Sequence, residues 1–247
     1  MSWIGLGLRG GVLTTRYPLA PDEMPGAYRG AIEPLDAPAE RQTLGANSCL
    51  SNAIEPGARR AGVDRARCFQ CAQCTRVAPD AFSAIPHFEL ANVEGPADAV
   101  RERLRRRART FGRSVHVRHV DAGSDGSEEQ ELMAIFNPFY DVNRLGIFLT
   151  ATPRHADVLI VTGVVTHAMR EPLMRAFEAM PEPKAVVALG TSACSGGIFA
   201  GSRSVVGPVS AILPVDVMIP GTPPAPLSIL HGLWVTLGRA IARGTTV

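Results

Sequence analysis

The chain of 247 residues has almost no lysine, because Lys184 is the only one and the other basic residues are arginines. Aromatic residues make up only 6% of the chain and are not interleaved with basic ones, so nucleic-acid binding has little support. No glycine-rich GxGxxG turn joins a strand to a helix and no phosphate-binding P-loop is present, which leaves nucleotide chemistry without a site. No apolar stretch approaches the roughly 20 residues that span a bilayer. These absences predict a protein that is soluble or peripheral to a membrane.

The overall composition is that of an ordinary globular chain. Hydrophobic residues make up 46% and charged residues 19%, and the net charge of +2 favours no class of partner. The length allows one large domain or two modest ones.

Three of the five cysteines form a CxxCxxC run, Cys68, Cys71 and Cys74, and Cys49 precedes that run by nineteen residues. In bacterial ferredoxins such a run continues to a fourth cysteine, which binds the other cluster of a pair. Ala78 occupies that fourth position here. The run therefore keeps the three ligands of its own cluster and needs one upstream thiolate, which Cys49 supplies. We predict one [4Fe–4S] cluster held by these four cysteines.

Zinc is the main alternative metal for these four cysteine ligands. Four thiolates suit structural zinc, but zinc sites usually pair CxxC-type units, and three evenly spaced cysteines suit an iron–sulfur cluster better. A site without metal is a further alternative. We expect no disulfide, because the sequence shows no secretory signal and a thiolate-bound cluster implies a reducing compartment.

The chain divides into four segments. Residues 1–35 are rich in proline and glycine and predict an extended N-terminal arm, whose apolar start would lie on a membrane interface or pack on a neighbour. Residues 36–92 contain the cysteines and predict a reduced ferredoxin-like module. Residues 93–112 predict an arginine-rich linker helix, which is either a solvated connection or a surface for an acidic partner or lipid headgroups. Residues 113–247 alternate between strand and helix signals.

That alternation predicts a flavodoxin-like α/β domain with a parallel sheet. The expected strands are 114–120, 146–150, 156–162, 185–189 and 212–219, the last of them interrupted by Pro214. The expected helices are 128–139, 171–180 and 227–242, the last two of them amphipathic. Ligands of such sheets bind at the carboxyl ends of the strands, here 122–128, 163–167, 190–197 and 220–224. A flavin site would rest on fold analogy alone.

Two histidines of the first expected strand, His116 and His119, lie three residues apart. Side chains three apart on a strand face opposite sides, so we expect no joint metal site. For His155 a structural role is favoured over a catalytic one.

Five stretches of the C-terminal part point to a family. They are Asp-Ala-Gly-Ser at 121–124, Pro-Arg-His-Ala-Asp-Val-Leu-Ile-Val-Thr-Gly at 153–163, Met-Pro-Glu-Pro-Lys at 180–184, Ser-Gly-Gly at 195–197 and Leu-Pro-Val-Asp-Val-Met-Ile-Pro-Gly-Thr-Pro-Pro at 213–224. Through them residues 114–240 resemble the small subunit of group 4 membrane-bound [NiFe] hydrogenases, including formate hydrogenlyase, and the 20 kDa subunit of complex I.

The N-terminal part resembles a second subunit of the same complexes. Residues 12–85 are similar to the ferredoxin-type, 23 kDa-like subunit through Thr14–Pro18, Arg29–Gly30 and the cysteine module. The resemblance implies a fusion of two neighbouring electron-transfer subunits, joined by the arginine-rich segment.

In the resembling proteins the C-terminal domain holds a further [4Fe–4S] cluster on four cysteines. The corresponding positions here carry oxygen side chains, Asp125, Glu128, Ser192 and Thr222. Iron–sulfur clusters need thiolates, so we expect this second cluster to be absent. Hydrogen bonds or water would fill the vacated site, with a hard cation such as Mg²⁺ or Ca²⁺ as the alternative. Cys194 is expected to be a buried small hydrophobe, with a helper ligand or redox thiol as the minority view.

The resemblance implies a non-catalytic electron-transfer subunit on the cytoplasmic face of the inner membrane. Its partners would be a large hydrogenase-like or complex I 49 kDa-like subunit and the membrane-arm subunits. One alternative is a structural scaffold in a complex that no longer performs hydrogenase or quinone chemistry. Another is a free-standing small electron carrier. No catalytic residue is predicted.

Overall fold

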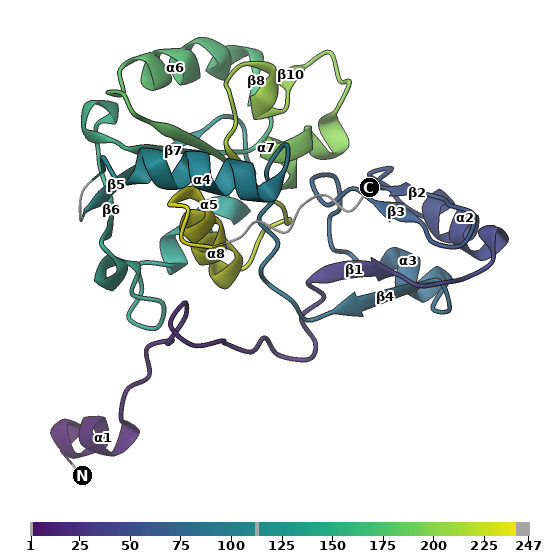
Figure 1. The fold of residues 1–247 in the computed structure, drawn as a ribbon, viewed down its shortest axis with the longest axis horizontal. Coiled ribbons are helices and arrows are strands. Elements are labelled where there is room, and N and C mark those ends of the chain that lie inside the picture. Colours follow the sequence, from purple (N-terminus) through teal and green to yellow (C-terminus); the bar gives the residue numbers. More distant parts are fainter. Residues whose placement is uncertain (1, 112–113, 241–247) are drawn as a thin grey trace.

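Five parallel strands form the central sheet of the structure, a computed structural model that describes residues 2–111 and 114–240 (Figure 1). Across the sheet their order is β11 (Val217–Ile219), β9 (Ala185–Leu189), β7 (Val158–Thr162), β5 (Val115–Asp121) and β6 (Ile147–Leu149). β7 and β9 are buried along their whole length, as apolar strands covered on both faces must be. The predicted α/β class with a parallel sheet is confirmed.

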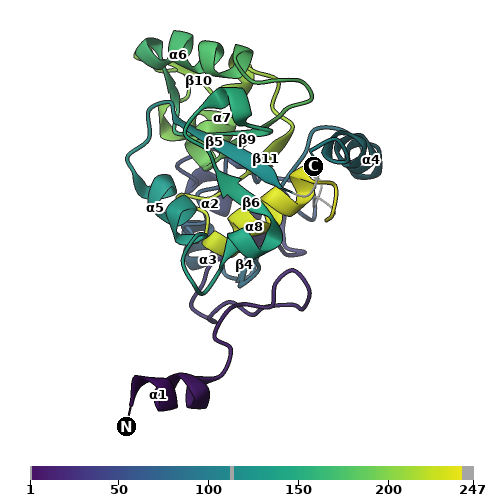
Figure 2. The same ribbon diagram turned by 90° about the vertical axis from the view of Figure 1, so that its left-hand side faces the viewer.

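Helices cover both faces of this sheet (Figure 2). One face is covered by α4 (Ala97–Ala108), α5 (Ser127–Ala134) and α8 (Pro226–Thr236), and the other by α6 (His167–Glu178) and α7 (Thr191–Ser195). Because side chains alternate along a strand, β7 contributes Val158 and Ile160 to the first core and Leu159 and Val161 to the second. Short elements complete this α/β body: η1 (Val142–Leu145), η2 (Pro153–His155), β8 (Val165–Thr166), η3 (Gly197–Phe199), β10 (Val205–Gly207) and η4 (Val209–Ala211).

Several predicted boundaries were wrong. The helix expected at 128–139 ends at Ala134. Of the strand expected at 212–219, with its predicted interruption at Pro214, only β11 forms. The last helix is not amphipathic, since nearly every residue of α8 is buried between the sheet and α4. It ends at Thr236, and the predicted end at Ala242 lies outside the described residues.

The arginine-rich segment forms α4, as the sequence predicts, and Val100 and Leu104 on one side of it are buried against α8. One turn further along the same side, Arg107 pairs with Asp216, with Nη1 and Oδ2 2.7 Å apart. This segment therefore covers the sheet as well as connecting two parts of the chain.

A smaller unit, the cysteine module, precedes α4. In it β1 (Ala31–Pro34) pairs antiparallel with β4 (Phe82–Ile85), and β2 (Ile54–Glu55) pairs with β3 (Gly62–Val63). Two helices, α2 (Ala39–Asn47) and α3 (Gln73–Val77), pack on these strand pairs. Gly45 is required inside α2, because a Cβ there would lie 2.2 Å from the ring of Phe82.

The N-terminal arm contains a helix that the sequence analysis missed, α1 (Trp3–Gly10). Its glycines obscured the pattern, and Ser2 caps it by accepting from the Gly5 amide at 3.3 Å. Figure 1 shows α1 standing apart from the rest of the molecule. None of the helices in the described part of the chain is long and apolar enough to cross a membrane.

Candidate metal centre and a second cavity

The four cysteines of the predicted cluster line one small cavity of the cysteine module. They are Cys49, Cys68, Cys71 and Cys74. Cys49 follows α2, Cys68 and Cys71 lie on the loop that leads into α3, and Cys74 lies in the first turn of α3. Gln70 and Ala72 adopt the left-handed backbone conformation, with φ of 59° and 57°. These two turns let successive cysteines of the run face the same space.

The environment of these thiols is apolar and contains backbone donors. Burial is the main cause that raises the pKa of Cys68 to about 12 and that of Cys74 to about 11, and the neighbouring thiols add to both shifts. The Ala53 amide donates to Cys49 Sγ at 3.3 Å and the Gln70 amide to Cys68 Sγ at 3.4 Å. Such donors favour the thiolate that metal binding produces.

The donor set fits an iron–sulfur cluster, because four soft thiolates are the ligands that such clusters take. Within residues 2–111 and 114–240, no three His, Cys, Asp or Glu side chains converge on one metal-ion position. The four cysteines of a cubane bind four different irons, so they surround a larger space than the ligands of a single ion do.

A second cavity brings together the four oxygen side chains at the positions that the resemblance assigned to another cluster. It has a volume of about 190 Å³. Its lining includes Asp125, Glu128, Ser192 and Thr222, together with Ser124, Phe69, Ile198 and Phe199. The oxygen groups follow β5, β9 and β11, so the cavity lies at the carboxyl edge of the parallel sheet.

The pKa values of the two carboxylates of this cavity are shifted in opposite directions. Glu128 is only 3% exposed, and its burial raises the pKa of its carboxyl. It occupies space left by Gly190, where a Cβ would lie 2.5 Å from Glu128 Oε1. Asp125 is exposed, and hydrogen bonds from the hydroxyl and amide of Ser127 lower its pKa.

One residue is shared by the two cavities, and one buried hydroxyl joins the loops beside them. Phe69 lines both of them. Thr191 is fully buried, donates from Oγ1 to the Cys68 carbonyl at 3.3 Å and accepts from the Gly221 amide at 3.1 Å. The cysteine loop is therefore attached to the loops that surround the second cavity. Sequence reasoning missed Phe69 and Thr191, since one is a spacer between cysteines and the other is an unremarked neighbour of Ser192.

The two histidines of β5 have separate partners. His119 Nε2 lies 2.9 Å from Thr162 Oγ1 and 3.5 Å from Glu129 Oε1, whereas His116 Nδ1 lies 3.7 Å from Asp157 Oδ2. Burial is the first cause that lowers the pKa of His119.

Cys194 is buried and donates to the Ala188 carbonyl at 3.4 Å. Burial raises the pKa of its thiol. Its surroundings are those of a small core residue.

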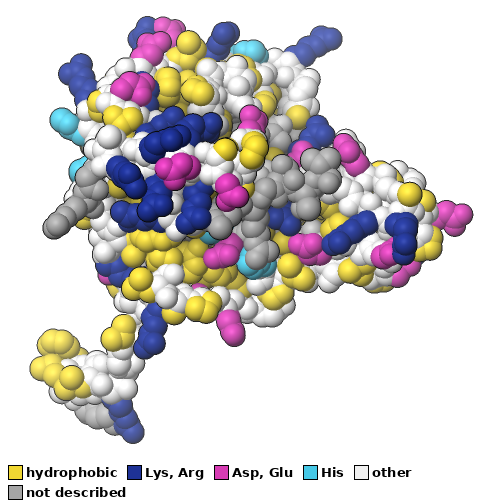
Figure 3. All heavy atoms as spheres, viewed as in Figure 1, with side chains coloured by type: hydrophobic (Ala, Val, Ile, Leu, Met, Phe, Trp, Pro, Cys, Tyr) yellow, Lys and Arg dark blue, Asp and Glu magenta, His cyan; other side chains and the backbone are white. Residues whose placement is uncertain are grey.

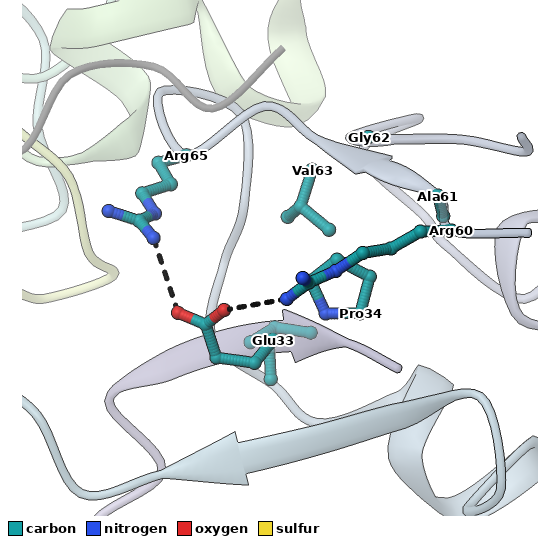
Figure 4. Close-up of a pocket in the computed structure, with 8 residues that line it drawn as sticks. Glu33, Pro34, Arg60, Ala61, Gly62, Val63 and Arg65 are labelled. Carbon is teal, nitrogen blue, oxygen red and sulfur yellow. Dashed lines mark hydrogen bonds and ion pairs between the residues drawn. The ribbon is translucent and has the colours of Figure 1, made fainter. Parts of the chain in front are cut away.

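A third cavity, of about 240 Å³, lies on the outer side of the cysteine module (Figure 4). Glu33 on β1 points into it and faces Arg65 at 3.3 Å and Arg60 at 3.6 Å. The two guanidinium groups compensate the carboxylate, so these three side chains hold β1 to the loops on either side of β3.

Comparison with known proteins assigns the α/β body to a family. Residues 126–235 match the family described as NADH ubiquinone oxidoreductase, 20 Kd subunit. A probable membrane-bound hydrogenase subunit of Pyrococcus furiosus is 41% identical over 143 residues, which cover 56% of this chain and 86% of that protein. The chain belongs to this family. The match falls in the α/β body and does not extend into the cysteine module.

Other similar proteins are subunits or complexes of related kinds. Formate hydrogenlyase subunit 7 of Escherichia coli K12 is 44% identical over 126 residues, covering 51% of this chain and 49% of that protein. The chain thus spans about half the length of that relative. Among solved structures, a chain of the archaeal membrane-bound sulfane sulfur reductase, a respiratory membrane complex, is 26% identical with a TM-score of 0.46, covering 55% of this chain and 77% of that one.

Proposed function

We propose that this protein is the iron–sulfur, peripheral-arm subunit of a membrane-associated oxidoreductase related to hydrogenases and complex I. It holds one [4Fe–4S] cluster on Cys49, Cys68, Cys71 and Cys74 in a ferredoxin-like module that is fused to the family domain. The observation that carries this proposal is the contrast between the two cavities. Four cysteines line one, and four oxygen side chains line the other.

When bound, the cluster supplies one-electron transfer, and the chain itself supplies its environment. Amides next to Cys49 and Cys68 donate to sulfur, and the apolar lining limits the access of water. Arg29 donates to the Cys71 carbonyl at 3.0 Å and holds the exposed end of the cysteine loop.

Metal and sulfide analysis of anaerobically purified protein tests this assignment. We expect about four iron and four sulfide per chain, with one cluster signal in the electron paramagnetic resonance (EPR) spectrum of reduced protein. Cys49→Ala and Cys71→Ala should lose the cluster. Cys194→Ala is the matched control and should retain it, because Cys194 lies outside the cavity. Zinc without sulfide would refute electron transfer, and two clusters per chain would refute the loss of the second site.

The partners proposed from the family are a large hydrogenase-like or complex I 49 kDa-like subunit and the membrane-arm subunits. The relatives' names place them in a formate hydrogenlyase and in a membrane-bound hydrogenase. Ile198 and Phe199 at the rim of the second cavity are 65% and 48% exposed, which suits a docking face. We propose that the complex lies on the cytoplasmic face of the inner membrane.

The oxygen-lined cavity favours a second candidate function. Without thiolates there, an electron on the first cluster has no relay through the α/β body, so the chain would be a structural scaffold of a complex that no longer does hydrogenase or quinone chemistry. Water, or a hard cation held by Asp125 and Glu128, would then fill the cavity.

Size-exclusion chromatography with light scattering separates a docked subunit from a free-standing electron carrier. Because apolar side chains such as Ile198 are exposed, we expect the chain expressed alone to self-associate and to become monodisperse when co-expressed with its large subunit. A stable monomer would favour the carrier.

A further inference from the structure

Helix α1 presents all of its large apolar side chains to solvent. Trp3 and Leu8 are each 82% exposed, and Ile4 and Leu6 are more than half exposed. No residue of this helix is buried. Figure 3 shows these side chains gathered at the detached end of the arm. A helix with this surface needs an apolar environment outside the chain.

The helix is amphipathic, with a broad apolar side and a narrow polar one. At 3.6 residues per turn, Trp3 and Leu6 lie on one side with Ile4 and Leu8, while Arg9 lies opposite together with the cap Ser2. A wide apolar side with an indole at one end and arginine on the polar side is typical of helices that lie in a membrane interface.

The first part of the arm, residues 2–21, carries charge of one sign. Between residues 2 and 21 the charged side chains are Arg9 and Arg16, and the first carboxylate is Asp22. This segment therefore complements an anionic surface and offers no acidic group that such a surface would repel.

The α/β body holds the base of the arm. The Arg144 guanidinium donates to the carbonyls of Thr15 and Tyr17 at 2.6 and 2.7 Å, and the Thr15 amide donates to the Phe139 carbonyl at 2.8 Å. Tyr17 packs edge-on against Phe88 with ring centroids 5.1 Å apart. The arm thus leaves the body at a fixed point, with α1 beyond it.

We propose that α1 is an interfacial anchor that binds the surface of a bilayer containing anionic phospholipid. Its apolar side enters the region of the headgroups and upper acyl chains, and Arg9 and Arg16 contact lipid phosphates. This anchor goes beyond the proposed function and does not depend on the cluster.

A second basic surface, the exposed side of α4, has to be tested separately. It carries Arg105, Arg106 and Arg109. Figures 1 and 2 show α4 on the body and α1 at the far end of the arm. Contact of α4 with lipid would rest on charge alone, whereas α1 can also insert its apolar side chains into the bilayer.

Vesicle flotation of the full chain tests the anchor. We expect binding to vesicles of phosphatidylglycerol and phosphatidylcholine, and weaker binding to phosphatidylcholine alone. Trp3→Ser with Leu8→Ser should weaken binding at least about tenfold. Arg9→Gln with Arg16→Gln should weaken it about fivefold per charge at low salt. Leu44→Ser is the matched control, since Leu44 is an exposed leucine on α2, away from the arm.

The proposal fails if the wild-type chain does not float, or if the Trp3 and Leu8 double variant floats as the wild type does. It also fails if Arg105→Gln with Arg106→Gln abolishes flotation while the α1 variants retain it, because α4 would then be the lipid contact. Flotation that appears only with a co-expressed membrane subunit would assign α1 to a protein partner. Iron content measured on the same samples reports the cluster independently of the anchor.

Discussion

Asp125 and Glu128 are three residues apart and line one cavity, yet their surroundings act on them in opposite directions. Two donors from Ser127 stabilise the charged form of Asp125. Glu128 lies on the sheet edge beside Gly190, where loss of water disfavours its charged form. At these two positions the cavity has one carboxylate that favours ionisation and one that resists it.

The pH dependence of stability should separate these two carboxylates. The pKa of Glu128 is higher in the folded than in the unfolded chain. The stability that this group contributes is therefore lost as the pH rises from the unfolded pKa of about 4.3 through the folded pKa. Glu128→Gln should therefore gain stability over wild type at neutral pH and lose that advantage near pH 4.

The pKa of Asp125 is lower in the folded chain. The stability that this group contributes is therefore present above the unfolded pKa of about 3.9 and lost as the pH falls through the folded pKa. Asp125→Asn should thus be less stable at neutral pH.

Denaturant midpoints of the two variants and wild type between acidic and neutral pH provide the measurement. Equal pH profiles for both variants would show that burial of Glu128 does not govern its titration.

At the scale of the element, α4 combines a charged exterior with a buried seam. Val100 and Leu104 face α8, and Arg107 reaches Asp216 next to β11. Asp216 also accepts from the Val186 amide at 3.0 Å, so the helix is attached to the sheet through one carboxylate. A connecting segment with these contacts contributes to the stability of the α/β body.

Leu104→Ala tests whether α4 belongs to that body. Leu104 is fully buried, so its truncation should cost about 2 to 5 kcal/mol of unfolding free energy. Arg106→Ala on the exposed side is the matched control and should change stability by less than about 0.5 kcal/mol. Similar small effects in both variants would mean that α4 is only a tether.

At the scale of the whole molecule, the cysteine module and the α/β body meet at Thr191 and Phe69. Thr191 hydrogen-bonds both to the Cys68 carbonyl and to the Gly221 amide. Phe69 extends from the cysteine loop to the oxygen-lined cavity. The cysteine loop, where we propose the cluster, is thus supported partly by residues of the other unit.

Thr191→Val should weaken this support. The variant leaves a buried amide and a carbonyl without their partner, at a cost of about 1 to 3 kcal/mol. We expect faster release of iron to a chelator and a change in the EPR line shape. Thr191→Ser keeps the hydroxyl and should behave as wild type does. Unchanged release from the valine variant would show that the module holds its cluster without help from the body.

Secondary structure was predicted correctly from the sequence where a single local signal, such as an apolar run or a series of helix formers, decides the element. Continuous apolar runs predicted β7 and β9, and the dense helix formers after Pro96 predicted α4. They failed where packing decides: α8 is buried on all sides because α4 covers it, and the glycines of α1 hid a helix that Ser2 caps.

The residue types alone set the ligand chemistry of the two sites. Cysteine spacing selects soft ligands at one site, and the oxygen side chains at Asp125, Glu128, Ser192 and Thr222 exclude thiolate ligation at the other, because ligand type is a property of the residue. Folding brings these four positions into one cavity with Phe69, and it places Thr191 between the cysteine loop and Gly221. It also leaves α1 free of the core. Such relations depend on loops that are distant in sequence and come together at one sheet edge. Residue spacing along the chain does not predict which loops come together.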